Sequence, residues 1–282
     1  MSSPTSLRAI RLLLGLGGIV GGFGVPVPPL AAAPLLRDAA NLGATPADQL
    51  AVAGNACGPA ALLNAFRFGD HHWQRAATAV AGDTDKARLL AIIRTWGLRP
   101  SRHLAGRLRW TRHGVNVDDL CDMANEMTRG QLLPQVQLEI LMLQPGETSP
   151  GLLQRVHGRL ASSLANGLPP IISIRRIAHR SEAGQPPEWV VVQGHFVTVV
   201  GLPRKLVKNA TAFPVTYIDP WGGKRGEGRL TLSRRAFLPA HAPATAAAPC
   251  LEADFPQVSV GNDLLRAKDF ALMTLAAAIG RW

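Results

Sequence analysis

A cysteine at position 57 has the surroundings of a nucleophile. Gly58 and Pro59 follow it, and apolar residues such as Leu62 and Phe66 then recur at helical spacing. Because proline is tolerated in the first turn of a helix, the pattern predicts a helix that begins at Cys57. The positive end of the helix dipole and the unpaired N–H groups there favour a thiolate. A free cysteine is more often a small buried apolar residue. The residues that accompany Cys57 therefore decide whether it is a nucleophile or a core residue.

A cysteine nucleophile needs a base and a third group that orients the base. His195 opens a β-branched run at 194–201, and the next such run, at 215–223, contains Asp219. Both runs are typical of strands. An antiparallel pair with its turn centred on Val207 sets His195 opposite Asp219, with Cβ atoms about 4.5–5.5 Å apart. Alone, a core histidine and an Asp-Pro turn would explain these residues; together with Cys57 they predict a triad.

Three segments carry a resemblance to a known family. They are Asn-Ala-Cys-Gly-Pro-Ala-Ala-Leu at 55–62, Gly-His-Phe-Val-Thr-Val-Val-Gly at 194–201 and Tyr-Ile-Asp-Pro-Trp-Gly-Gly at 217–223. In this order they resemble the signatures of the papain-like cysteine peptidases related to the bacteriocin-processing, double-glycine leader peptidases. The resemblance spans about residues 49–237. It implies a papain-like fold, a peptide or protein substrate, Cys57 as nucleophile, His195 as base and Asp219 as orienting residue, with no cofactor.

The oxyanion residue departs from the family pattern. Family members carry a Gln or Asn a fixed few residues before the cysteine, and its side chain joins the cysteine N–H in the oxyanion hole. The candidates here, Gln49 and Asn55, are off that spacing. We favour Gln49, because Asn55 is placed to cap the helix.

Composition limits the other classes of function. The chain of 282 residues has a net charge of +11, which suits anionic partners such as a cell-wall polymer. Its basic groups are short and its aromatic residues few, so we expect no nucleic-acid binding. The segment 99–113 is rich in Arg and His, including His103 and His113. No Cys or acid is spaced for a metal site beside them, so we expect a solvated loop and no metal.

The N-terminus predicts export. Residues 1–11 are basic, 12–36 carry no charge, and Ala31-Ala32-Ala33 offers a cleavage site. Residues 1–33 therefore indicate a signal peptide or an N-terminal membrane anchor. Either places the rest in the periplasm, the cell envelope or outside the cell, and membrane contact is expected only through an uncleaved segment.

The remaining chain, 34–282, predicts a single domain of the α+β class. Helices are expected at 84–97, 116–130 and 149–167, with Thr84, Asn116 and Ser149 as caps. Strands follow from 171 onward, a short helix is expected from Ser233, and 239–249 is a linker. Residues 262–279 predict a C-terminal docking helix. A helix-rich half that carries Cys57 would then pack on an antiparallel sheet that carries His195 and Asp219, which agrees with the papain-like resemblance.

An exported chain with three cysteines has one that cannot join a disulfide within the chain, which agrees with a free, reactive Cys57. Cys121 and Cys250 then remain, either as a disulfide or as two separate buried thiols.

The sequence therefore predicts an exported cysteine peptidase that hydrolyses peptide bonds through a Cys-His-Asp triad. One alternative is a cell-wall amidase or endopeptidase with the same triad. Another is a papain-like binding module without turnover, which the displaced oxyanion residue favours and the intact triad opposes.

Overall fold

A computed structural model describes residues 36–180, 188–233, 250–261 and 264–282. These residues belong to one compact unit that begins at Pro34. The predicted signal or anchor, the short helix expected after Ser233 and the linker at 239–249 lie outside the described residues.

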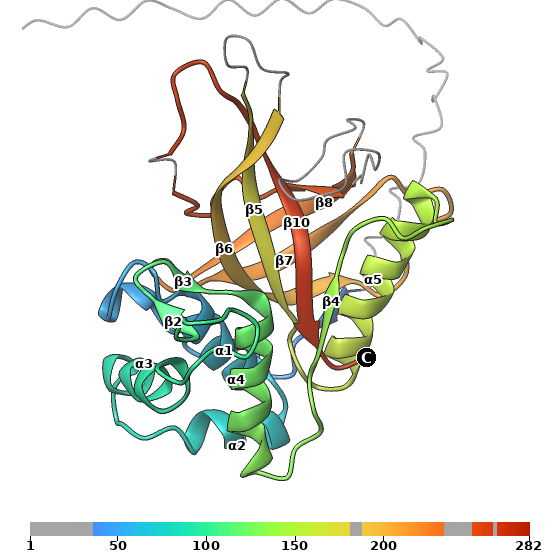
Figure 1. Cartoon of the computed structure of the whole chain (residues 1–282). Helices are drawn as coiled ribbons and strands as arrows, with labels where there is room; N and C mark the ends of the chain where they lie inside the picture. Colours follow the sequence, from blue (N-terminus) through green and yellow to red (C-terminus); the bar gives the residue numbers. More distant parts are fainter. Residues whose placement is uncertain (1–35, 181–187, 234–249, 262–263) are drawn as a thin grey trace, which may run out of the picture. The chain divides into compact units, whose positions relative to one another are not determined.

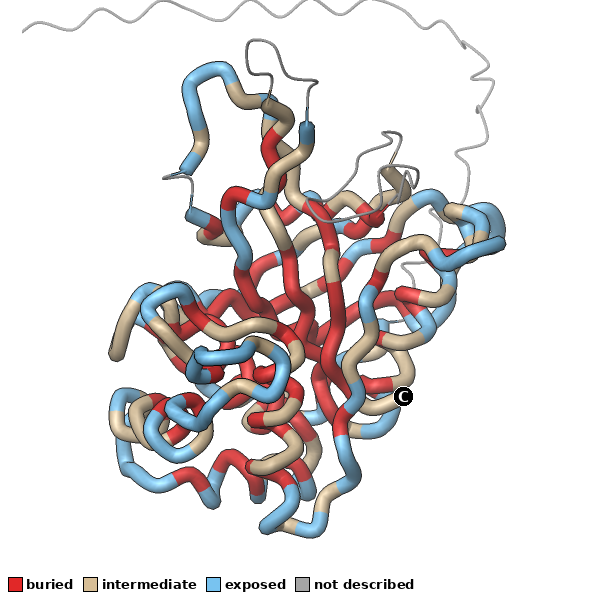
Figure 2. The backbone as a smooth tube through the Cα atoms, viewed as in Figure 1, coloured by how far each residue is buried: buried red, intermediate tan, exposed pale blue. Residues whose placement is uncertain are grey.

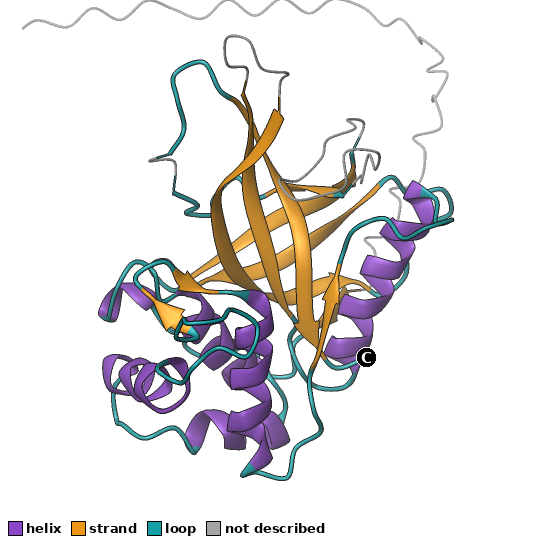
Figure 3. Ribbon diagram, viewed as in Figure 1, coloured by secondary structure: helices purple, strands orange, loops and turns teal. Residues whose placement is uncertain are grey.

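Six antiparallel strands form a closed barrel (Figure 1, Figure 3). They are β5 (Ile171–Arg180), β6 (Glu188–Pro203), β7 (Ala212–Asp219), β8 (Lys224–Leu232), β9 (Leu251–Asp254) and β10 (Phe270–Gly280). The neighbours run β6-β5-β10-β9-β8-β7, and pairing between β7 and β6 closes the ring. Two short strands extend it: β1 (Leu36–Asp38) pairs with β6, and β4 (Gln137–Ile140) pairs with β10.

The expectation of a helix-rich, papain-like α+β fold is therefore wrong. The structure has 33% strand and 30% helix, and its sheet closes into a barrel. The C-terminal segment explains much of the difference, because residues 270–280 form strand β10 and not a docking helix. β10 pairs with β5 on one side and with β9 and β4 on the other, so its backbone bonds go to neighbours distant in sequence. Tertiary pairing overrides the helix propensity of its alanines.

Four helices, α1 to α4, gather at one end of the barrel, and α5 lies apart from them (Figure 1). The helical elements are η1 (Gln49–Ala51), α1 (Cys57–Phe68), α2 (His71–Thr78), α3 (Asp85–Ile92) with its π-helical continuation η2 (Ile93–Gly97), α4 (Val117–Arg129) and α5 (Ser149–Ala165). The three helices expected between the Cys and His motifs are confirmed as α3, α4 and α5. Thr84 and Asn116 cap α3 and α4 as predicted, whereas Thr148 takes the place of Ser149 at α5. No helix in the described ranges is long and apolar enough to cross a membrane.

Two apolar clusters hold the unit together, and buried residues follow both the helices and the barrel strands (Figure 2). One contains α1 and α4 side chains such as Phe66 and Leu120, and the other fills the barrel around Tyr217. Cys121 belongs to the helical cluster, while Cys250 packs beside Ile177 in a small third one. All three cysteines are free thiols, so of the two alternatives left open for Cys121 and Cys250 the structure has the separate buried thiols.

A buried hydrogen bond joins the helical end to the barrel. The Thr198 hydroxyl on β6 donates to the Ala61 carbonyl on α1 at 3.0 Å. We expect Thr198→Val, which keeps the shape and removes the donor, to lower the free energy of unfolding by about 1–2 kcal/mol. Urea unfolding measures it, with the exposed Thr95→Val as the control expected to stay within about 0.5 kcal/mol. Equal losses in both variants would contradict a specific role for this bond.

Candidate active site

Cys57 is the first residue of α1, as the sequence predicted. Its neighbour Gly58 packs closely on strand β3 (Gly114–Val115): a Cβ at Gly58 would lie 2.3 Å from Val115 Cγ1. A larger residue would therefore push the two apart. The expected cap is not formed, because Ala56 is the N-cap and makes no side-chain bond, and the Asn55 amide instead donates to the Thr111 carbonyl at 3.1 Å.

His195 and Asp219 meet in the buried wall of the barrel. His195 Nε2 lies 2.7 Å from Asp219 Oδ1, and the two residues are 5% and 1% exposed. They are not directly opposed as expected, because the ladder between β6 and β7 runs from Thr198 opposite Ile218 and shifts before Gly201. His195 lies beyond the end of this ladder and pairs with Ile174 of β5 instead. The imidazole nevertheless reaches the carboxylate.

Two backbone N–H groups also bind Asp219. Trp221 N–H donates to Oδ1 at 2.8 Å, and Ser259 N–H donates to Oδ2 at 2.8 Å. The first follows from the Asp-Pro-Trp turn. The second comes from the segment after β9, and sequence reasoning missed it because a backbone donor leaves no signal in residue type.

The electrostatics couple the three residues. Burial lowers the pKa of His195, but hydrogen bonds to Asp219 and to the Cys57 side chain outweigh it and raise the pKa to about 9. Burial also disfavours a charged Asp219, yet the bonds from His195 and the two N–H groups hold the pKa of its carboxyl below the usual value. At neutral pH His195 is thus an imidazolium between a carboxylate and the Cys57 sulfur.

Cys57 and His195 open onto a cleft of about 560 Å³. Its wall is formed by Gly54, Asn55, Cys57, Arg112, His113, Gly114, Val191, Val192, Gln193, Gly194, His195, Trp221, Ser259 and Gly261. Of the two oxyanion candidates, Asn55 lines the cleft, whereas Gln49 is fully buried and its amide donates to the Gly54 carbonyl at 2.5 Å. This volume lies within the range of ligand-binding clefts, about 300–1,000 Å³.

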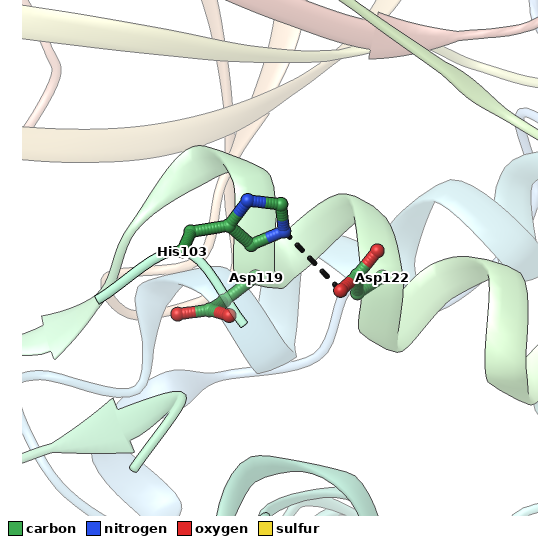
Figure 4. A group of neighbouring side chains, drawn as sticks. All are labelled: His103, Asp119 and Asp122. Atoms are coloured by element: carbon green, nitrogen blue, oxygen red, sulfur yellow. Dashed lines mark hydrogen bonds and ion pairs between the residues drawn. The ribbon is translucent and has the colours of Figure 1, made fainter. Parts of the chain in front are cut away.

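Most of the segment 99–113 is exposed as expected, including His103 and His113, but the segment is not only a loop. Arg109 is buried and bonds to Glu126 at 2.9 Å, and a hairpin of β2 (Trp110–Thr111) and β3 (Gly114–Val115) follows it. His103 also meets two acids, Asp119 and Asp122, with ligand atoms within 4.8 Å of one another (Figure 4).

This group has other bonds. His103 Nε2 lies 3.3 Å from Asp122 Oδ2, and Asp119 accepts bonds from the Ser101 hydroxyl and the Asn116 amide. Arg109 Nη2 adds a cation 3.9 Å from Asp122. The carboxylates therefore have protein partners that explain them without a metal.

Comparison with known proteins gives no relative: no family model, no curated protein and no solved structure matches this chain.

Alkylation tests the contact between Cys57 and His195. At pH 7 iodoacetamide should label Cys57, and His195→Ala should slow this labelling about tenfold, because the variant removes the side chain that bonds the sulfur. Cys121 and Cys250 are internal controls, because burial raises the pKa of each thiol to about 12. Peptide mapping of the labelled protein separates the three sites. Labelling of Cys57 that is unchanged in His195→Ala would contradict a role for this contact in the reactivity of the thiol.

Proposed function

We propose that this protein is a cysteine peptidase that hydrolyses peptide bonds through Cys57, His195 and Asp219. One observation carries the proposal: a buried His195 bonds to Asp219 through Nε2 and to the Cys57 side chain, at the wall of an open cleft. Nucleophile, base and orienting group in this order are what acyl transfer requires. The proposal rests on the site and not on the fold, since one chemistry recurs on unrelated folds.

His195 carries out both proton transfers of the proposed reaction. The Cys57 thiolate attacks the carbonyl carbon, and the His195 imidazolium gives its proton to the leaving amine as the C–N bond breaks. Water then attacks the thioester, with neutral His195 taking its proton, and the thiolate leaves. Because Nε2 of His195 faces Asp219, the other ring nitrogen, Nδ1, is the one available to move this proton.

The oxyanion would form near the start of α1, where backbone N–H groups have no partner within the helix. The Cys57 N–H is the first donor we assign. Gln49 and Asn55 stay as candidates for the second, and each uses its amide to bond a backbone carbonyl, of Gly54 and of Thr111 respectively. Either amide has a second N–H hydrogen to offer.

A cell-wall amidase or endopeptidase with the same triad is the second candidate. The net charge of +11 favours it, because a basic protein concentrates at an anionic envelope. Export through residues 1–33 belongs to both proposals, since each substrate class is found outside the cytoplasm.

The deciding experiment incubates the full chain with a mixed peptide library and, separately, with purified cell-wall fragments. Cys57→Ala is the matched control in both. Cleavage of peptides that Cys57→Ala abolishes supports the peptidase, and cleavage of the fragments alone supports the second candidate. If neither substrate is cut by the wild type, the catalytic proposal is refuted and a binding module takes its place.

A further inference from the structure

The hairpin of β2 and β3 brings positive charge to the cleft beside Cys57. Arg112 and His113 form its turn, and both are exposed and line the cleft. Among the described residues that line this cleft, none is an aspartate or a glutamate. The only acid of the triad, Asp219, is 1% exposed and committed to His195. A bound substrate would therefore meet a cation without a compensating carboxylate.

The hairpin is fastened to the residues that hold the nucleophile. Trp110 Nε1 donates to the Asn55 carbonyl at 3.2 Å, and the Asn55 amide donates back to the Thr111 carbonyl at 3.1 Å. Val115, on the other strand, packs against Gly58 at the first turn of α1. These contacts fix the position of the turn relative to Cys57, so the charge belongs to the site and not to a solvated loop.

The Arg112 guanidinium is oriented by a neighbour, and no carboxylate of the described residues neutralises it. Its Nε donates to His113 Nε2 at 3.2 Å, which leaves both terminal nitrogens for another acceptor. No acid of the described residues lies within ion-pair distance of it. Arg109 and Arg155 differ in this respect, because Arg109 pairs with Glu126 and Arg155 pairs with Glu147. Two parallel N–H groups of a guanidinium match the two oxygens of a carboxylate.

We propose that Arg112, oriented by His113, binds a carboxylate of the substrate within a few residues of the scissile bond. This inference deepens the proposed function and rests on it. The carboxylate has two sources that share one chemistry, an Asp or Glu side chain and the free C-terminus of a peptide. The site would then select acidic peptides, or peptides cut close to their C-terminus, over neutral ones.

Binding to Cys57→Ala tests the inference without turnover. The probes are fluorescent Ala/Gly hexapeptides. A first set has an amidated C-terminus and a single Glu, placed at a different position in each peptide, and a second set has Gln in place of that Glu. One further peptide contains Gln and has a free C-terminus. Fluorescence anisotropy gives Kd. We expect the best Glu peptide, or the free-acid peptide, to bind about tenfold more tightly than its neutral counterpart, and which of them does so identifies the source. Equal affinities, or no binding of any probe, would overturn the inference.

Three further variants in the Cys57→Ala background locate the effect. Arg112→Gln should remove the tenfold preference, Arg112→Lys should retain part of it, and Arg94→Gln, at an exposed position in η2, should leave it unchanged. A preference that survives Arg112→Gln would also overturn the inference. The proposed function is judged separately, because cleavage of peptides by the wild type without any acid preference would leave the peptidase standing and remove only this selectivity.

Discussion

Replacing Cys57 with alanine should lower kcat/KM by at least about 10⁴-fold for any peptide that the wild-type chain cleaves. The nucleophile is lost outright, and neither His195 nor Asp219 can form the thioester in its place. The fold should persist, because the change removes one sulfur from a residue that lies at the cleft. Progress curves with a fluorogenic peptide measure the loss, and circular dichroism verifies the fold.

Cys121→Ala is the matched control for this prediction. Cys121 is a buried thiol on α4, its sulfur faces the Val136 carbonyl, and it does not line the cleft. Its replacement should cost some packing and leave kcat/KM close to the wild-type value. Substantial cleavage by Cys57→Ala, or an equal loss in the two variants, would mean that Cys57 is not the nucleophile.

The second large effect is expected at Asp219. Its two oxygens accept from His195, Trp221 and Ser259, and an asparagine offers only one oxygen to these three donors. The less costly orientation keeps the oxygen toward His195 and Trp221, so that the amide faces the Ser259 N–H. The imidazole then retains its tautomer, and we expect Asp219→Asn to lower kcat by about 10²-fold. This is less than the roughly 10⁴-fold loss that the same change causes in a serine-protease triad.

The pH profile gives this prediction a second readout. In the wild type the protonated His195 persists up to its pKa of about 9, so kcat/KM should fall as the pH rises through 9. The carboxylate of Asp219 contributes to that raised pKa, so the alkaline limb should move to lower pH in Asp219→Asn. Asp219→Ala provides the contrary outcome. If this variant keeps both the wild-type kcat and the wild-type alkaline limb of the pH profile, another residue orients the imidazole.

Local signals made part of the structure predictable. The helix at Cys57 followed from Gly-Pro and apolar spacing, and α3 and α4 followed from their caps, which are satisfied within three residues. The proximity of His195 and Asp219 followed from two β-branched runs in succession. The register did not, because the shift between Val199 and Gly201 depends on how the barrel closes and leaves no mark in local spacing.

Features that depend on distant partners were not predictable. The closed barrel requires β10 to lie between β5 and β9, and no local pattern in an alanine-rich segment specifies those neighbours. The choice between a disulfide and two separate thiols stayed open for a similar reason, since the number of cysteines does not show which cluster each one joins. Arg112 was counted with a solvated loop because its place at the cleft is set by Asn55, which is remote in sequence.

The hydrogen bond between Thr198 and Ala61 joins residues 137 positions apart in the chain, and it bears on when the proposed active site forms during folding. Cys57 and its helix are made from neighbouring residues, whereas the strand that carries His195 is held in place by β5, which in turn pairs with β10. A contact over such a separation forms slowly, because the chain loses the entropy of closing a long loop before the contact stabilises it. In a newly made chain the contact between Cys57 and His195 therefore forms only when the barrel closes. Under the proposed function, hydrolysis would begin only after the barrel has closed, and the unfinished chain would be protected from its own nucleophile.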